Sequence, residues 1–306
     1  MYSIKQIKKG IRKPQLIIEQ LQKAPYVAHD YTMRSIFGHE GIDIMGSDWD
    51  NLIVLDGCRY DLFDKYAELT GDLRKVRSGG SSTREWLKAN FQDKTFPDTV
   101  YVSGNAQLDR HGVSGNFFVV DKVWLDGWDE DLYTVCPDVM AERTLKANHE
   151  HPNKRIISHF VQPHYPFIGE TGQAIEHRAW TFNGRLEEGG KAKTIWKKLR
   201  DREIDEETVW RAYIENLQLT LPHVERLCDE LPGKTVVTSD HGNAFGEWGV
   251  YGHPHNRYLD CLINVPWLEF DGDDTRKKVT TGEIDETTTE FDEGVVDDRL
   301  SALGYK

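Results

Sequence analysis

From residue 50 onward, short apolar runs alternate with longer amphipathic stretches. Runs of about four to eight apolar, often β-branched residues are typical of strands buried on both faces of a parallel sheet. The predicted strands are Leu52–Leu55, Thr99–Val102, Ile156–Phe160, Thr235–Thr238 and Val265–Phe270, and the predicted helices cover residues 60–68, 83–92, 138–148 and 206–231. Strands that alternate with helices in this way predict a three-layer α/β sandwich with a mostly parallel central sheet.

The first 24 residues follow a different pattern. Ile4, Ile7 and Ile11 form one apolar stripe among basic residues, and Pro14 interrupts the predicted helix. We therefore separate a basic amphipathic N-terminal segment, residues 1–48, from an α/β domain with an acidic C-terminal segment, residues 49–306. The apolar stripe has two interpretations, which are packing on the surface of the domain and peripheral contact with an anionic membrane.

Composition and charge exclude several classes of protein. The chain has 306 residues and a net charge of −13, which argues against nucleic-acid binding because phosphate-backbone affinity requires concentrated Lys and Arg. No apolar run approaches the roughly 18 residues of a membrane span, and no secretory signal is recognisable. The four cysteines match no zinc or disulfide pattern. These observations predict a cytoplasmic protein, with membrane association through the N-terminal segment as the alternative.

Polar, metal-binding residues follow two of the predicted strands. Asp56 comes directly after Leu52–Leu55, and the tandem Asp240 and His241 comes just after Thr235–Thr238. Ligands of doubly wound sheets bind at the carboxyl ends of the strands. One carboxylate oxygen and one imidazole nitrogen at the same point suit zinc and similar divalent ions. The competing interpretation is helix capping and turn chemistry.

Further candidates lie in loops. His164 and His253 are flanked by Pro and Gly, and Arg59 follows Asp56 closely. Ser82 with Glu85 predicts a capping box at a helix start. A hydroxyl at this helix N-terminus, from one of the residues Ser81, Ser82 and Thr83, would also face free N–H groups that suit a transferring anion.

Three segments resemble, in order, the motifs of the alkaline phosphatase superfamily, on its sulfatase and phosphoethanolamine-transferase side. Asn51–Asp61 resembles the first metal-ligand strand with its downstream Arg. His159–Phe167 is similar to the substrate-facing His-Pro segment. Thr235–Pro254 resembles the second metal motif and the glycine-rich loop that follows it. The resemblance covers roughly residues 50–270 and implies an alkaline-phosphatase-like fold.

The resemblance also implies roles for individual residues. The ligands of one divalent metal ion (Zn, Mn, Ca or Mg) would be Asp56, Thr83, Asp240 and His241. Thr83 would be the nucleophile, with Ser81 and Ser82 as alternatives. His164 and His253 would contact the transferred group or a second metal ion, and Arg59 would neutralise the charge of that group.

Two departures from the family narrow this expectation. Gly57 stands where classical sulfatases have a second Asp, and the nucleophile segment has no Cys, so a formylglycine sulfatase is not expected. The segment Tyr213–His223 contains His223 but no matching Asp-x-x-x-His, so a second metal site is not expected either.

The predicted function is a metal-dependent hydrolase that cleaves phosphate or sulfate esters through a covalent Thr or Ser intermediate. The alternatives are a phospho-alcohol transferase that acts on a surface lipid or glycan, and a non-catalytic binding member of the fold. The expected partner is a small-molecule, glycan or lipid-linked ester. The sequence does not distinguish a phosphate ester from a sulfate ester as the substrate, and it does not define the oligomeric state.

Overall fold

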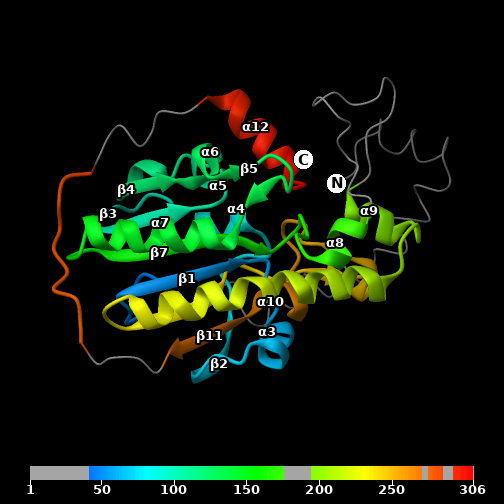
Figure 1. Cartoon of the computed structure of the whole chain (residues 1–306), viewed down its shortest axis with the longest axis horizontal. Coiled ribbons are helices and arrows are strands. Elements are labelled where there is room, and N and C mark those ends of the chain that lie inside the picture. The colour runs from blue at the N-terminus through cyan, green and yellow to red at the C-terminus, as the bar shows by residue number, and fades with distance from the viewer. Residues whose placement is uncertain (1–40, 176–193, 271–274, 285–291, 306) are drawn as a thin grey trace, which may run out of the picture.

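The computed structural model describes residues 41–175, 194–270, 275–284 and 292–305, and it confirms the α/β class (Figure 1). A seven-stranded sheet has the order β2-β11-β8-β1-β7-β3-β4. Its strands are β1 (Asn51–Asp56), β2 (Gly71–Arg77), β3 (Phe96–Ser103), β4 (Phe117–Lys122), β7 (Arg155–Pro163), β8 (Thr235–Ser239) and β11 (Asn264–Phe270).

The sheet is mostly parallel, as predicted. Strands β8, β1, β7, β3 and β4 run parallel, whereas β11 is antiparallel to both β8 and β2. All five predicted strands exist. The two edge strands, β2 and β4, were not predicted. The sequence of β2 mixes charged and apolar residues, whereas β4 contains the apolar run Phe117–Val120, which the sequence analysis did not assign to a strand.

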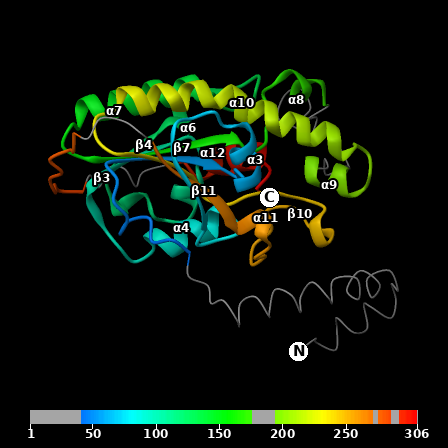
Figure 2. The ribbon, with the colours of Figure 1, turned by 90° about the horizontal axis from the view of Figure 1, so that it is seen from below.

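Helices cover both faces of the sheet (Figure 2). Helices α7 (Pro137–Glu150) and α10 (Glu206–Glu230) lie on one face, and α4 (Thr83–Phe91) lies on the other. Strand β1 is apolar on both of its faces because alternate residues pack against opposite helix layers. Ile53 and Leu55 belong to the core under α7 and α10, whereas Leu52 and Val54 pack with Trp86 of α4. The three-layer sandwich is therefore confirmed.

The remaining elements are short. They are α3 (Tyr60–Tyr66), α5 (Gln107–Arg110), α6 (Val123–Asp126), β5 (Trp128–Asp129), β6 (Thr134–Val135), α8 (Glu170–Ala174), α9 (Ile195–Arg200), β9 (Ala244–Phe245), β10 (Tyr251–Gly252), α11 (Asp260–Ile263) and α12 (Glu293–Ala302), with 3₁₀ turns at Ser114–Asn116 and Glu247–Gly249. The four predicted helices match α3, α4, α7 and α10 to within two residues at each end.

The predicted amphipathic helix of residues 1–24 lies outside the described residues. Its membrane contact and the cytoplasmic location therefore stay predictions. Ile44, which the sequence assigned to the N-terminal segment, is buried in the core beside α4. Among the described residues, none of the helices combines the length and apolarity that crossing a bilayer requires.

Candidate active site

The carboxyl ends of β1 and β8 bring three candidate ligands together. The two strands are parallel neighbours with Leu55 opposite Ser239, so Asp56 and Asp240 emerge side by side. Asp56, Asp240 and His241 are fully buried. Each offers one ligand atom, and these atoms all lie within 4.8 Å of one another.

Each carboxylate uses one oxygen in hydrogen bonds and leaves the other without a partner. Asp56 Oδ2 accepts from Tyr305 OH at 2.6 Å and from Asn105 Nδ2 at 2.9 Å. Asp240 Oδ1 accepts from the backbone N–H groups of Gly57 at 3.0 Å and His241 at 2.8 Å. Asp56 Oδ1 and Asp240 Oδ2 have no hydrogen-bond partner. A buried carboxylate oxygen without a partner is costly, so both atoms point to an absent ligand.

His241 completes the donor set. Its Nδ1–H donates to the carbonyl of Gly242 at 2.9 Å, which leaves Nε2 with a free lone pair. Nε2 lies 3.5 Å from Asp56 Oδ1 and 3.3 Å from Asp240 Oδ2, the two oxygens without partners. Two oxygens and one nitrogen therefore converge, which is a donor set that divalent metal ions accept.

The electrostatics of the site favour a cation. Burial, and then the charge of Asp240, raise the pKa of Asp56 well above its usual range. Two carboxylates buried side by side repel each other and lose hydration. A divalent ion between their free oxygens would offset both costs, so the residues present fit a metal.

Thr83 is the hydroxyl that faces this cluster. It is the first residue of α4, and its Oγ1 lies 3.2 Å from His241 Nε2 and 3.3 Å from Tyr305 OH. The two alternative nucleophiles have other partners. Ser81 Oγ donates to Glu85 at 2.8 Å, and Ser82 Oγ lies 2.7 Å from His255 Nδ1.

The predicted capping box does not form. Ser82 occupies the N-cap position of α4, but its side chain makes no capping hydrogen bond. Glu85 reaches back to the backbone N–H of Ser81, at 3.0 Å, rather than to that of Ser82. The capping-box prediction is wrong because His255 engages the Ser82 hydroxyl.

His164 and His253 lie beside the cluster. Their Nε2 atoms are 2.8 Å apart, and the ring of His253 stacks on that of His241 with centroids 4.5 Å apart. Burial, reinforced by the neighbouring His241, lowers the pKa of His164 to about 4. The same causes place the pKa of His253 well below its ordinary value. Both imidazoles are therefore neutral near pH 7.

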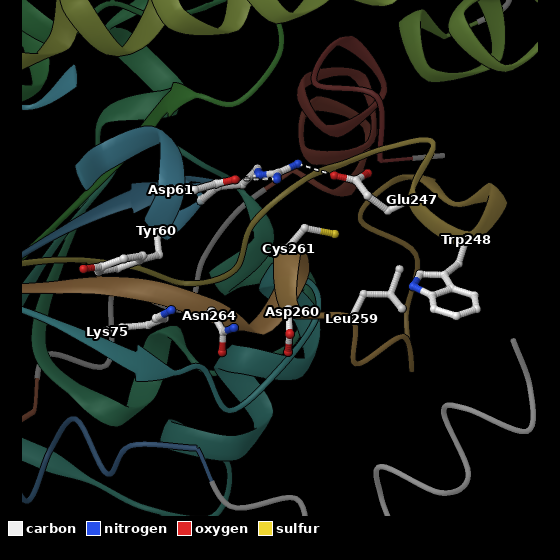
Figure 3. Close-up of a pocket in the computed structure, with 10 residues that line it drawn as sticks. Tyr60, Asp61, Lys75, Glu247, Trp248, Leu259, Asp260, Cys261 and Asn264 are labelled. Carbon is white, nitrogen blue, oxygen red and sulfur yellow. Dashed lines mark hydrogen bonds and ion pairs between the residues drawn. The ribbon is translucent and has the colours of Figure 1, made fainter. Parts of the chain in front are cut away.

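Arg59 is not brought to the cluster. Its guanidinium donates to the carboxylate of Asp61, to Glu247 Oε1 at 2.6 Å and to the carbonyl of Asn243 at 3.2 Å. The dashed lines of Figure 3 mark these ion pairs beside Asp61 and Glu247. The charge of Arg59 is thus already matched by two carboxylates.

Sequence reasoning missed three residues that the structure places at the cluster. Asn105 and Tyr305 hold Asp56, and the ring of Tyr305 stacks on that of His164 at 5.1 Å and 3°. His159 Nε2 lies 3.9 Å from Asp240 Oδ2. Asn105 follows β3, so the strand-end rule, by which ligands bind at the carboxyl ends of the strands of a doubly wound sheet, could have identified it. Tyr305 follows α12, far along the chain, and no local signal marks it.

No protein-family model and no curated protein matches the sequence. Several solved structures are similar to the chain. One is the soluble domain of lipooligosaccharide phosphoethanolamine transferase A from Neisseria meningitidis, with 13% identity, 72% of this chain and 76% of that chain covered, and a TM-score of 0.47. Another is the C-terminal periplasmic domain of phosphoethanolamine transferase EptC from Campylobacter jejuni, with 14% identity, 78% and 92% covered, and a TM-score of 0.44.

A third similar structure is a protein in the alkaline phosphatase superfamily from Vibrio parahaemolyticus, with 11% identity, 76% and 62% covered, and a TM-score of 0.37. At TM-scores below 0.5 these similarities carry no weight for function, which is inferred from the geometry of the site.

Proposed function

We propose that the protein is a metal-dependent enzyme that cleaves or transfers a phosphate or sulfate ester, with Thr83 as the nucleophile. One observation supports this most strongly. Two buried carboxylate oxygens without partners, Nε2 of His241 and Oγ1 of Thr83 converge at the carboxyl ends of two neighbouring strands.

A single divalent ion would be held by Asp56, Asp240, His241 and Thr83. When bound, such an ion lowers the pKa of a hydroxyl and offsets the negative charge of the ester. Among the described residues, these two Asp and His241 are the one group of three acidic, His or Cys side chains with ligand atoms close enough to share an ion. One metal site is therefore proposed.

The chain's own residues then have separate tasks. Thr83 gives its hydroxyl proton to water as its Oγ1 attacks the phosphorus or sulfur atom in line, and the ester oxygen leaves with its bonding electrons and takes up a proton from water to become the alcohol. The N-terminus of α4 favours the anionic group beside Thr83. His253 would turn its Nε2–H from His164 to an equatorial oxygen of the transferred group, and His164, whose Nδ1–H donates to the carbonyl of Tyr165, would position the imidazole of His253. Water, or an acceptor alcohol, finally displaces Thr83 and restores its hydroxyl.

Hydrolase and transferase differ only in this last acceptor, and the same residues serve both. A surface lipid or glycan as acceptor would make the protein a transferase. Addition of an acceptor alcohol to the assay separates the two, because a transferase forms a new ester where a hydrolase releases free phosphate or sulfate.

The test starts with the metal content of the purified protein. Turnover is then measured on p-nitrophenyl phosphate, bis-p-nitrophenyl phosphate and p-nitrophenyl sulfate with Zn, Mn, Mg or Ca. Asp240→Asn should lose metal and turnover but keep its circular dichroism spectrum, because Asp240 lies at a strand end. Asp61→Asn is the matched control, since Asp61 pairs with Arg59. A wild-type protein that binds none of these metals and turns over none of the esters would refute the proposal and leave a non-catalytic binding protein.

A further inference from the structure

A hollow of about 560 Å³ opens beside the candidate active site. Helix α9, the segment from Trp248 to Arg257, and Tyr305 contribute the described residues that line it. His253 and Tyr305 lie at its inner end, and both touch the metal-ligand cluster. His253 stacks on His241, and Tyr305 donates to Asp56. A molecule in this hollow would therefore reach the reacting atoms.

The lining of the hollow is cationic. Lys197, Arg200 and Arg257 contribute to it, and none of its described lining residues is an Asp or Glu. The chain as a whole has 51 acidic residues against 38 basic ones. A concave surface whose described lining is basic and free of Asp and Glu, in so acidic a protein, concentrates positive potential and attracts an anion.

A neighbouring hollow around Arg59 differs from the cationic hollow in the charge of its lining (Figure 3). It has about 370 Å³, and its charged lining residues are of both signs, namely Arg59, Lys75, Asp61, Glu247 and Asp260. Arg59 is already paired there with two carboxylates. This second hollow therefore offers an anion little net attraction.

Aromatic side chains wall the cationic hollow. Trp196 of α9 packs edge-on against Phe245 at 5.3 Å, which holds its ring in place. Trp248 is 64% exposed and has a φ of +54°, a left-handed conformation that is unusual for a bulky residue. Figure 3 shows its indole directed away from Glu247. Aromatic walls exclude water and strengthen a contact between opposite charges.

We propose that this hollow binds the alcohol portion of the substrate, and that this portion carries a second anionic group besides the ester that reacts. The inference rests on the proposed function, because the hollow is the approach to Thr83. Lys197 and Arg200 are three residues apart and share one face of α9. Arg200 Nε already lies 3.0 Å from Asp201 Oδ1, so Lys197 would be the main contact of the second anion.

The experiment compares two probes by isothermal titration calorimetry on the full chain. Glucose 1,6-bisphosphate has the second anionic group, and glucose 1-phosphate lacks it. Wild-type protein should bind the bisphosphate about tenfold more tightly, the effect expected of one charge-assisted contact. In Lys197→Ala most of this preference should disappear. Lys198→Ala is the matched control, because Lys198 is adjacent on α9 but does not line the hollow, and it should keep the preference.

Equal affinity for the two probes, or an equal loss in both Lys variants, would overturn the proposal. The binding readout is separate from turnover. If the wild type distinguishes the probes but turns over no aryl ester, the proposed function fails and the anion site stands. If it turns over an aryl ester without distinguishing the probes, only the inference about the hollow fails. Asp240→Asn should lose turnover and still prefer the bisphosphate.

Discussion

The two oxygens of each carboxylate in the cluster have different environments, and this difference determines which oxygen is available to a metal ion. Asp56 and Asp240 each hold one oxygen in hydrogen bonds and aim the other at Nε2 of His241. Preset orientation of this kind reduces the reorganisation that ligand binding would otherwise require. Side chains that hold the first oxygen therefore matter as much as the ligands themselves.

Thr83→Ala should lower kcat by at least about a thousandfold, because the attacking oxygen is removed. Ser82→Ala and Ser81→Ala should keep most of the activity, since their hydroxyls bond to His255 and Glu85. Steady-state kinetics on the best aryl ester measure the three variants side by side. Full activity of Thr83→Ala, with loss in either Ser variant, would move the nucleophile to that Ser.

Tyr305→Phe should weaken metal binding by about tenfold, as is usual when a residue that holds a metal ligand is lost. The variant removes the hydroxyl that Asp56 and Thr83 contact but keeps the ring that stacks on His164. We expect kcat to fall with little change in KM, and excess metal to restore part of it. Tyr133→Phe, at an exposed tyrosine, is the control. Unchanged metal affinity and kcat in Tyr305→Phe would show that the hydroxyl is dispensable.

At the scale of elements, the turn after β1 determines where Asp56 points. Gly57 has a φ of +68°, and a Cβ there would lie 2.6 Å from Asn243 Nδ2. The turn therefore requires glycine for two reasons, backbone conformation and space. The N–H of Gly57 also donates to Asp240, so a displacement of this turn would shift the carboxylates of both Asp56 and Asp240.

Gly57→Ala should destabilise the fold by about 1–3 kcal/mol and weaken metal binding. Gly112→Ala separates the two causes, because Gly112 has a similar φ of +67° but nothing within 4 Å of the added Cβ. Urea denaturation and metal titration of both variants provide the comparison. If the two variants lose equal stability and neither loses metal, the close contact with Asn243 is unimportant.

The sequence predicts elements best where burial is complete. Strands β1 and β8 are mainly apolar runs in the centre of the sheet, and they were predicted to within one residue at each end, whereas the prediction for the central strand β7 stopped three residues before its end at Pro163. Edge strand β2 has mostly exposed or half-buried residues, so it lacks that signal. The antiparallel direction of β11 was not predicted, because an apolar run gives no strand direction.

The residues of the candidate site were likewise predicted only in part from the sequence. The strand-end rule placed Asp56, Asp240 and His241 at one edge of the sheet, and the structure shows them together. It could not show that Glu247 engages Arg59, since these two residues are 188 positions apart in the sequence. Tyr305 was missed for the same reason, as its partner Asp56 is 249 residues away.

At the scale of the whole molecule, buried histidines should make the fold sensitive to acid. His159 is 1% exposed and lies 2.7 Å from Tyr101 OH through its Nδ1. Burial lowers its pKa from 6.5 to about 4. Between these values the unfolded chain binds a proton that the folded chain does not, so the free energy of unfolding falls as the pH falls through this window.

From pH 7 to pH 5, His159 alone should reduce the free energy of unfolding by about 2 kcal/mol. Urea denaturation at pH 7, 6 and 5, with chelator present, measures this dependence. His159→Gln removes the titrating group, so its stability should change less over the same range. Parallel pH profiles for the wild type and His159→Gln would contradict the prediction.

The contact between Tyr305 and Asp56 also has a consequence for the newly made chain. The ribosome adds Tyr305 a full 249 residues after Asp56. At about 5–20 residues per second this interval is roughly 12–50 s. During that time Asp56 lacks Asp240 until β8 has been synthesised, and it lacks the phenol that orients it until Tyr305 is added. A chain on which Tyr305 has not yet been synthesised thus lacks the complete arrangement around Asp56, and the proposed metal site cannot be complete before Tyr305 is added.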